Sequence, residues 1–351
     1  MKKARRGMIL PLVIMAMFVV LIVSAGAQLS SWRAARGAQL HWDAERALHA
    51  ADAATADKIA AWSAQQSANT PIGVELLDSV DDDGWTMRRD VRRTAPLVAV
   101  VHTRFERLLG VPAVAAALGD PYRTRRDITR IVRLAPPEFG IAAATTTLGA
   151  LVVNGAGIDA RDLGAQRHHP LDDCGSVRDT ASVDAVRAHY IDAIMMSFVQ
   201  GDIIALPTTA VDAARQRFDR AWDLLQQRVH VATDDARYRD DPVAWRARVM
   251  LSASAESLRT NTRMVGVLAI DGDFIVRTAL HLDGVLIVRG ALDATRAPLD
   301  VDGAVIVRDT NARGSHFGST LTVRYAPCLV GRALATVARP MAAPFASWQG
   351  R

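Results

Sequence analysis

The sequence Gly266-Val-Leu-Ala-Ile-Asp-Gly-Asp returns twice further along the chain, as Gly284-Val-Leu-Ile-Val-Arg-Gly-Ala and as Gly303-Ala-Val-Ile-Val-Arg-Asp-Thr. The second copy starts 18 residues after the first, and the third starts 19 residues after the second. Each copy is a short strand of Val, Ile, Leu or Ala, followed by a turn and a second short strand. One such unit cannot bury its apolar face alone, so units of this kind stack on one another. The repeats therefore predict the coils of a parallel β-solenoid.

This interpretation makes a geometric prediction. Val285–Val288 and Ala304–Val307 should be adjacent parallel strands, about 4.8 Å apart. A series of antiparallel hairpins is the alternative, because only three clear copies are present. An earlier copy starts at Gly149, with the sequence Gly-Ala-Leu-Val-Val-Asn-Gly.

A mainly helical insertion is expected between the Gly149 copy and the later ones. Thr208 or Thr209 caps a helix that runs to about Arg228. Asp241-Pro242 opens a second helix, which ends before Asn261. Nearer the N-terminus, the sequence Asp81-Asp82-Asp83-Gly84 predicts a turn. After it, β-branched and aromatic residues predict three strands, namely Trp85–Val91, Leu97–Thr103 and Ile128–Leu134.

Met8–Ala27 is a run of twenty residues without a charge, MILPLVIMAMFVVLIVSAGA. A helix of that length spans about 30 Å, which matches the hydrocarbon core of a bilayer. The basic residues before it favour a cytoplasmic N-terminus, with the bulk of the chain outside the cytoplasm; they are Lys2, Lys3, Arg5 and Arg6. A signal peptide cleaved near Ala27 is the alternative.

The helical pattern continues beyond the membrane span. No proline occurs between Gln28 and Trp62, and one helix face is marked by residues at helical spacing, namely Leu29, Trp32, Leu40, Ala44, Leu48, Ala51 and Thr55. A continuous helix from Met8 to Trp62 would be about 80 Å long. We therefore expect an amphipathic extension of the membrane helix over residues 28–66.

The N-terminus resembles that of a known family. Lys2-Lys3-Ala-Arg-Arg-Gly7 before the apolar run resembles a prepilin-type leader, and Asp43–Ala54 resembles the Ala- and Glu-rich segment after the membrane helix of PilX-like minor pilins. The resemblance covers about the first 60 residues. It implies a type IV pilus assembly protein that a prepilin peptidase cuts between Gly7 and Met8, and whose helix packs against those of other pilins. The chain departs from major pilins at Leu12, the fifth residue after the cleavage point, where most of them carry glutamate.

Composition and motif content argue against two classes of function, nucleic-acid binding and catalysis. The net charge is +5, but four of the 42 basic residues lie in the first six positions, and the other 38 face 37 acidic residues. We therefore expect no nucleic-acid partner. The chain contains no nucleophile elbow, phosphate loop, HExxH motif or dinucleotide fingerprint. We expect no enzyme activity, no cofactor and no catalytic residues.

Three sets of residues were candidates for chemistry. His168-His-Pro-Leu-Asp-Asp-Cys174 lacks the spaced pairs of a zinc site, and His189 or His316 would have to complete it, so we expect no metal. The carboxylates of the repeats lie beside glycines and are interpreted as turn residues; they are Asp271, Asp273, Asp283, Asp300 and Asp302. Cys174 and Cys328 are the only cysteines, and they could form a disulfide outside the cytoplasm.

Together these features predict an α+β protein. A long transmembrane and amphipathic helix is followed by a β-rich head with short parallel solenoid-like repeats and a helical insertion. The expected function is that of a minor pilin or pseudopilin in the assembly or tip of a type IV pilus or related secretion filament. The alternative is a membrane-anchored extracytoplasmic protein that binds a polysaccharide or a protein.

The expected location is the inner membrane, crossed once, with the bulk of the chain outside the cytoplasm. The expected segments are a leader (1–7), a transmembrane helix (8–27), its extension (28–66), a β-rich region (67–135), a first solenoid-like segment (136–180), the helical insertion (181–262), the repeats (263–330) and a tail (331–351).

Overall fold

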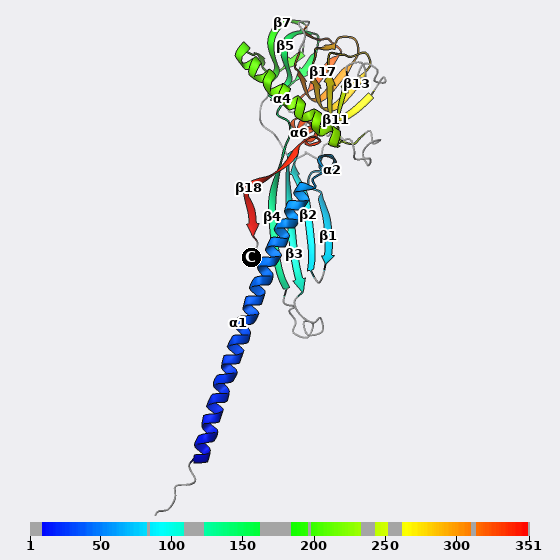
Figure 1. Ribbon diagram of the computed structural model, residues 1–351. Helices are drawn as coiled ribbons and strands as arrows, with labels where there is room; N and C mark the ends of the chain where they lie inside the picture. Colours follow the sequence, from blue (N-terminus) through cyan, green and yellow to red (C-terminus); the bar gives the residue numbers. More distant parts are fainter. Residues whose placement is uncertain are drawn as a thin grey trace, which may run out of the picture.

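The computed structural model describes residues 9–82, 85–108, 123–161, 184–195, 198–232, 243–251, 262–309 and 314–349. They form two parts, which we call the stalk and the head (Figure 1). The stalk consists of the long helix α1 (Ile9–Ala60) and a five-stranded antiparallel sheet. The head lies beyond the C-terminal end of α1 and contains a large parallel sheet. The predicted α+β class is confirmed at this level.

Helix α1 is continuous over 52 residues, which corresponds to about 78 Å. Its one proline, Pro11, lies in the first turn, where the missing amide costs no hydrogen bond. The predicted continuity from the apolar run into the amphipathic extension is confirmed. The helix ends at Ala60, and after a break the chain forms the short helix α2 (Ala64–Asn69). Ser63 caps α2, because its side chain accepts a hydrogen bond from the Gln66 amide at 3.1 Å.

The stalk sheet has the strand order β1-β2-β3-β4-β18, with antiparallel neighbours throughout. β2, β3 and β4 confirm the three strands predicted before the repeats. The expected Asp81–Gly84 turn falls partly on strand β1, and residues 83 and 84 lie outside the described residues. The strands are β1 (Glu75–Asp82), β2 (Trp85–Ala95), β3 (Val98–Leu108), β4 (Arg123–Ala135) and β18 (Arg339–Gln349).

One face of the stalk sheet packs against the C-terminal half of α1. The helix residues buried there are spaced by three or four positions and are small, namely Ala44, Ala47, Ala51 and Thr55. Alanine lets the helix backbone approach the sheet closely. The hydroxyl groups of Thr55 and Thr103 are hydrogen-bonded at 2.7 Å in this interface, which identifies the helix-facing side of β3.

The head is inserted into the stalk sheet. The chain leaves the stalk at Ala135, the last residue of β4, and returns at Arg339, the first residue of β18. These two residues lie opposite each other in the β4–β18 ladder. The two connections between stalk sheet and head are therefore adjacent.

The head sheet has thirteen strands, and all its recorded pairings are parallel. The strands are β5 (Ala143–Asn154), β6 (Gly157–Asp159), β7 (Asp184–Met195), β8 (Phe198–Gln200), β9 (Ile203–Ala205), β10 (Arg246–Leu251), β11 (Thr262–Asp271), β12 (Phe274–Ile275), β13 (Leu280–Val288), β14 (Leu292–Ala294), β15 (Leu299–Val307), β16 (Ser315–Phe317) and β17 (Leu321–Arg324).

The predicted parallel pairing of the repeat strands is confirmed. β13 pairs in parallel with β15, and Val285 lies opposite Ala304. Gly266, Gly284 and Gly303 lie opposite one another in successive strands and have φ angles of 115°, 142° and 150°. A Cβ atom on Gly303 would lie 1.7 Å from the carbonyl oxygen of Gly284. The repeat therefore needs glycine both for its positive φ and for the close approach of the next backbone.

The earlier copy lies in the same sheet, but its glycine has another purpose. β5 pairs with β15 so that Thr145 lies opposite Val305, which places Gly149 level with Asp309 instead of Gly303. A Cβ atom on Gly149 would lie 2.1 Å from a carboxylate oxygen of Asp309. Gly149 thus makes room for a side chain, and alignment on this glycine gave the wrong register.

The predicted helical insertion over residues 181–262 is only partly helical. Helix α4 (Thr208–Ala232) confirms its first helix, whose predicted apolar face includes the buried residues Val211, Phe218, Trp222 and Leu225. The second predicted helix is wrong, because residues 246–251 form β10 and pair in parallel with β11. The Ala, Arg, Met and Leu residues there favour a helix intrinsically. The backbone of residues 246–251 instead forms parallel-sheet hydrogen bonds with β11, so the segment becomes a strand.

The core of the head is apolar on both sides of its sheet. Val285, Leu286, Ile287 and Val288 are consecutive and fully buried. Helix α6 (Pro327–Ala335) packs against β11, β13 and β15, so residues that point away from the interior are covered as well. Parallel sheets covered on both faces have continuous apolar strands of this kind.

Helix α2 joins the stalk to the head. Asn69 exchanges two hydrogen bonds with the backbone of Trp245 in the head, at 3.0 and 2.8 Å. Arg93 of the stalk donates to the Ser67 and Ala68 carbonyls, both at 3.0 Å. Arg332 of the head donates to the Ala68 carbonyl at 3.2 Å. The last carbonyl groups of α2 therefore accept cationic donors from both parts.

Candidate functional site

The N-terminal half of α1 is a large apolar surface. Every side chain from Leu12 to Ala35 is exposed, whereas burial against the sheet begins near Leu40. Leu12, Met15 and Ile22 are 70%, 71% and 66% exposed. The helix projects away from the sheet along this half (Figure 1). Residues 12–32 carry no charged side chain, and an exposed apolar helical segment of this size is not stable in water and needs an apolar environment.

In the part of the chain that the structure describes, α1 is the one helix long and apolar enough to cross a membrane. Its position near the N-terminus fits either a single membrane anchor or a signal sequence. Gly7 and Met8, the predicted cleavage residues, lie outside the described residues. Cleavage between them stays a prediction.

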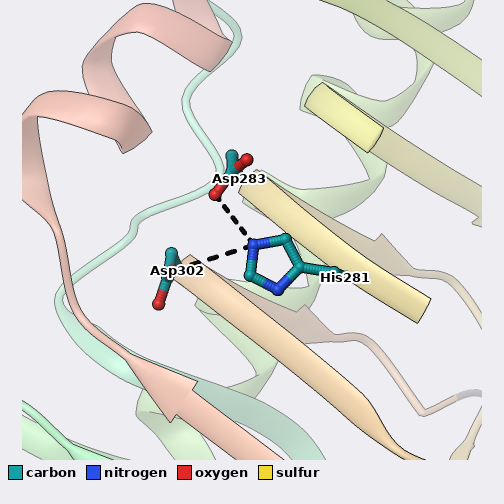
Figure 2. A group of neighbouring side chains, drawn as sticks. All are labelled: His281, Asp283 and Asp302. Atoms are coloured by element: carbon teal, nitrogen blue, oxygen red, sulfur yellow. Dashed lines mark hydrogen bonds and ion pairs between the residues drawn. The ribbon is translucent and has the colours of Figure 1, made fainter. Parts of the chain in front are cut away.

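A second group of functional side chains lies on the head, where two repeats meet. His281 and Asp283 come from β13, and Asp302 comes from the neighbouring β15 (Figure 2). The His281 Nε2 atom lies 3.1 Å from Asp283 Oδ1 and 3.9 Å from Asp302 Oδ2. One ligand-capable atom from each residue lies within 4.8 Å of the others. Asp283 is fully buried.

Two arginines complete this group, which we call the charged cluster (Arg263, His281, Asp283, Asp302 and Arg324). Arg263 donates from Nε and Nη2 to Asp283 Oδ2, at 3.0 and 2.9 Å. Arg324 of β17 donates to Asp302 Oδ1. The hydrogen bond with Asp283 raises the pKa of His281, the charge of Asp302 raises it further, and burial and Arg263 oppose the shift.

The chemistry of the charged cluster favours a structural role. Both oxygens of Asp283 already have donors, and a guanidinium group also occupies Asp302. A divalent cation would have to displace two arginines and compete with a histidine whose pKa favours the protonated form. The cluster therefore joins the four neighbouring strands β11, β13, β15 and β17 by charge-assisted hydrogen bonds.

The interpretation of the repeat carboxylates as turn residues needs correction. Asp271, Asp283, Asp300 and Asp302 lie in strands, whereas Asp273 lies between β11 and β12. Asp283 and Asp302 occupy the same repeat position, directly before Gly284 and Gly303. This repeated Asp-Gly pair was the sequence signal for the cluster. His281, Arg263 and Arg324 carried no such signal, because their roles depend on the strand register.

The other candidate residues are not brought together. His168, His169 and Cys174 lie outside the described residues. His189 Nδ1 lies 3.4 Å from the Leu206 carbonyl oxygen, and His316 is exposed on β16. Cys328 lies at the start of α6, and the described part of the chain has no free cysteine. The Cys174–Cys328 pairing stays a prediction.

Comparison with known proteins gives no relative: no protein-family model, curated protein or solved structure matches the chain significantly.

Proposed function

We propose that this protein is a minor pilin or pseudopilin-like component of a type IV pilus or related secretion filament, with a structural and not a catalytic role. One observation carries the proposal: only the C-terminal half of α1 packs against the stalk sheet. That half is bound to the sheet, while the N-terminal half is exposed over residues 12–35 and is apolar as far as Ala27. The prepilin-like leader lies directly before that exposed half.

The physical argument concerns what can cover the free half of α1. The uncharged residues 12–32 span about 32 Å, enough to cross the hydrocarbon core of a bilayer. The same apolar surface can be covered by the corresponding helices of neighbouring subunits. A subunit could then leave the bilayer without exposing its helix to water, while the stalk sheet and head stay outside the membrane. The four leader charges would oppose that transfer, because each is costly to desolvate without a partner.

We further propose that the head is a short β-solenoid. The support is the glycine column at Gly266, Gly284 and Gly303 and the parallel register of β11, β13 and β15. A rigid stack of this kind would hold a surface at a fixed distance from the membrane. The charged cluster, which crosses β11, β13, β15 and β17, would strengthen the stack.

N-terminal sequencing of the membrane-extracted protein tests the pilin proposal first. Cleavage by a prepilin peptidase should give a mature chain that starts at Met8, and Gly7→Leu should block it. Ala27→Leu is the matched control, since it would block a signal peptidase and should leave this processing unchanged. A start near Gln28 would indicate a secreted protein, and an intact leader would indicate a plain membrane anchor. Either result contradicts the proposal.

A second experiment separates filament packing from anchoring. Residues 12–27 are replaced by a permutation of the same residues, which preserves hydrophobicity and length but changes every packing contact. We expect the permuted protein to reach the membrane and to be absent from the sheared surface-filament fraction that contains the wild type. Equal recovery of both proteins in that fraction would show that specific helix packing is not required.

The alternative is a membrane-anchored binding protein that never enters a filament. It is favoured by the size of the head, which presents a polar outer surface around Arg263, His281 and Asp300. A mature protein that keeps its leader and binds a cell-surface polysaccharide through this surface would support it. Loss of that binding in Arg263→Ala, with unchanged membrane content, would identify the surface.

A further inference from the structure

The two sides of the stalk sheet carry opposite charge. β1 contains four acidic residues, with the sequence Glu-Leu-Leu-Asp-Ser-Val-Asp-Asp, and no basic residue. β4, three strands away, contains five arginines and one aspartate. β1 and β18 form the two edges of this sheet, and β18 pairs with the part of β4 nearer the head, from Ile128 to Ala135. The stalk is therefore polarised across its width.

On β1, the outer side chains are acidic and apolar. Asp78 faces α1 and pairs with Lys58 and Arg89. Glu75, Leu77 and Asp81 alternate with it and point to the opposite face. All three are exposed, Leu77 by 75%, and neither carboxylate has an ion-pair partner among the described residues. We call these three residues the acidic edge.

β1 carries charged side chains, which oppose edge-to-edge pairing, but it lacks other features that protect an edge strand. Its sequence has neither lysine nor proline, and its pairing with β2 has no bulge. β18, at the opposite edge, contains Pro340 and Pro344, and its register with β4 shifts between Ala342 and Ser347. A neighbour at the β18 side must therefore be bound mainly by side chains and not by an extended ladder.

The β18 side offers complementary side chains. Arg133 of β4 lies opposite Met341 of β18, and Arg339 is two positions away on the same face. All three are exposed, Met341 by 57%. Neither arginine forms an ion pair within the described part of the chain. We call these three residues the basic edge.

A third arginine lies beside the basic edge. Arg228 of α4 donates only to the carbonyl groups of Ala135 and Val337 among described residues, at 3.1 and 2.9 Å. Burial lowers its pKa, and the charge of Arg339 lowers it further. This corner of the molecule therefore holds positive charge that the described acidic groups do not neutralise.

The two edges are offset along the stalk, with the basic edge nearer the head. The register through β2 and β3 places Glu75 level with Ile131, two residues from Arg133. It places Asp81 level with Arg125 near the other end of β4. Ile131 is exposed by 38% on this face and adds an apolar group at the level of Glu75, whereas Leu77 is level with Thr129. Both edges therefore combine apolar groups with charge, with opposite signs.

We propose that the acidic edge of one subunit docks against the basic edge of a second copy of this chain. This inference rests on the proposed filament function, because parallel α1 helices would bring the stalk sheets of neighbours side by side. The contact joins two different surfaces, so each bound pair leaves one acidic and one basic edge free. Such a contact repeats without closing on itself and generates an open helical assembly.

A photo-crosslinker in place of Leu77, in the full-length protein in its native membrane, tests the contact. We expect dimeric adducts that mass spectrometry maps to peptides containing Arg133 or Met341 of the second copy. Adducts that map to β1 would instead show a symmetric contact between acidic edges and would overturn the proposal. So would the absence of any adduct between two copies.

Charge reversal supplies the specificity test. We expect Glu75→Arg with Asp81→Arg to lower the adduct yield about tenfold, and Arg133→Glu with Arg339→Glu to do the same. Combining all four changes should restore most of the yield, because complementarity returns with inverted sign. Asp223→Arg and Arg220→Glu, exposed on α4 of the head, are matched controls that should leave the yield unchanged. Failure of the four-residue combination to restore it would contradict the pairing.

The same measurements separate this inference from the filament proposal. Adducts absent from a wild-type protein that enters the sheared filament fraction would refute the edge contact alone. Adducts present in a protein that never leaves the membrane would refute the filament function and support the edge contact as a membrane oligomer. Loss of both would refute both.

Discussion

The stalk and the head of this molecule bury their sheets in different ways. The stalk sheet has one face packed on α1, through small residues such as Ala47 and Ala51, and its other face is open. The head sheet is covered on both sides, and Val285–Val288 are buried without interruption. The stalk thus depends on one helix–sheet interface, whereas the head depends on close parallel pairing of its repeat strands. We expect substitutions at repeat positions of the head to cost more than comparable changes in the stalk.

The largest effect is expected from Gly303→Val. Its Cβ would lie 1.7 Å from the Gly284 carbonyl oxygen, and valine strongly disfavours a φ of 150°. We expect a loss of roughly 4 kcal/mol or more, enough to unfold the head. Hydrogen exchange of the β13 and β15 amides measures it. Gly37→Ala, in an exposed stretch of α1 with free space around it, should be neutral or slightly stabilising. Unchanged protection of β15 in Gly303→Val would show that the glycine column is dispensable.

A smaller effect is expected when one buried side chain in each core is shortened to alanine. Leu286→Ala should cost about 3–4 kcal/mol, because the residue is fully buried in a core covered on both sides. Val101→Ala in the stalk removes two methyl groups and should cost about 1–2 kcal/mol. Regional hydrogen exchange in the two variants reports each loss separately. Equal costs would remove the contrast between the two cores.

The stalk has a polar weak point in its helix–sheet interface. Thr55→Val would leave the buried Thr103 hydroxyl without its 2.7 Å partner, and should cost about 1–2 kcal/mol. Thr55→Val with Thr103→Val removes both hydroxyl groups and should recover most of that loss. Exchange rates of the β3 amides provide the measurement. A double variant that is less stable than the single one would show that the hydroxyl pair is not the source of the effect.

The smallest effect is the pH dependence of the charged cluster. The folded state raises the pKa of His281 above its unfolded value near 6.5, because the hydrogen bond with Asp283 and the charges of Asp283 and Asp302 outweigh burial and the charge of Arg263. The stabilisation is therefore complete below that unfolded pKa and is lost as the pH rises through the raised folded pKa. His281→Gln should flatten head stability between pH 6 and 8, as ordinary titration ranges for histidine suggest. His316→Gln, at an exposed histidine, is the control. A wild-type profile that rises with pH in this window would contradict the sign.

The contrast between stalk and head also explains what the sequence could reveal. The glycine-aligned repeats at Gly266, Gly284 and Gly303 were predicted in the correct register, because each repeat packs against its neighbour in sequence. β5 lies between β15 and β7, and this placement could not be found by matching glycines, because Gly149 accommodates Asp309. The segment of β10 was wrongly predicted as a helix. It forms a strand because pairing with β11 outweighs the local helix propensity of its residues.

The functional sites were likewise predictable only where their residues are contiguous in the sequence. The apolar half of α1 is one uninterrupted run of uncharged, mostly apolar residues, so the sequence alone was enough to predict a membrane-spanning segment there. The charged cluster draws on Arg263, Asp283 and Arg324 from three strands, and only their pairing brings them together. The opposite charges of the stalk edges are present in the sequences of β1 and β4. Their positions at two sides of one sheet become evident only with the strand order.

The insertion of the head between β4 and β18 has a mechanical consequence. A force that pulls the head away from the membrane would act on Ala135 and Arg339 together, at adjacent points of one ladder. It would run along β4, whose ladder with β3 extends over eleven residue pairs. The hydrogen bonds of that ladder would be loaded in shear and would have to break nearly simultaneously, instead of opening one by one like a zipper. The stalk is thus arranged to transmit tension between the head and α1 without unravelling from an end.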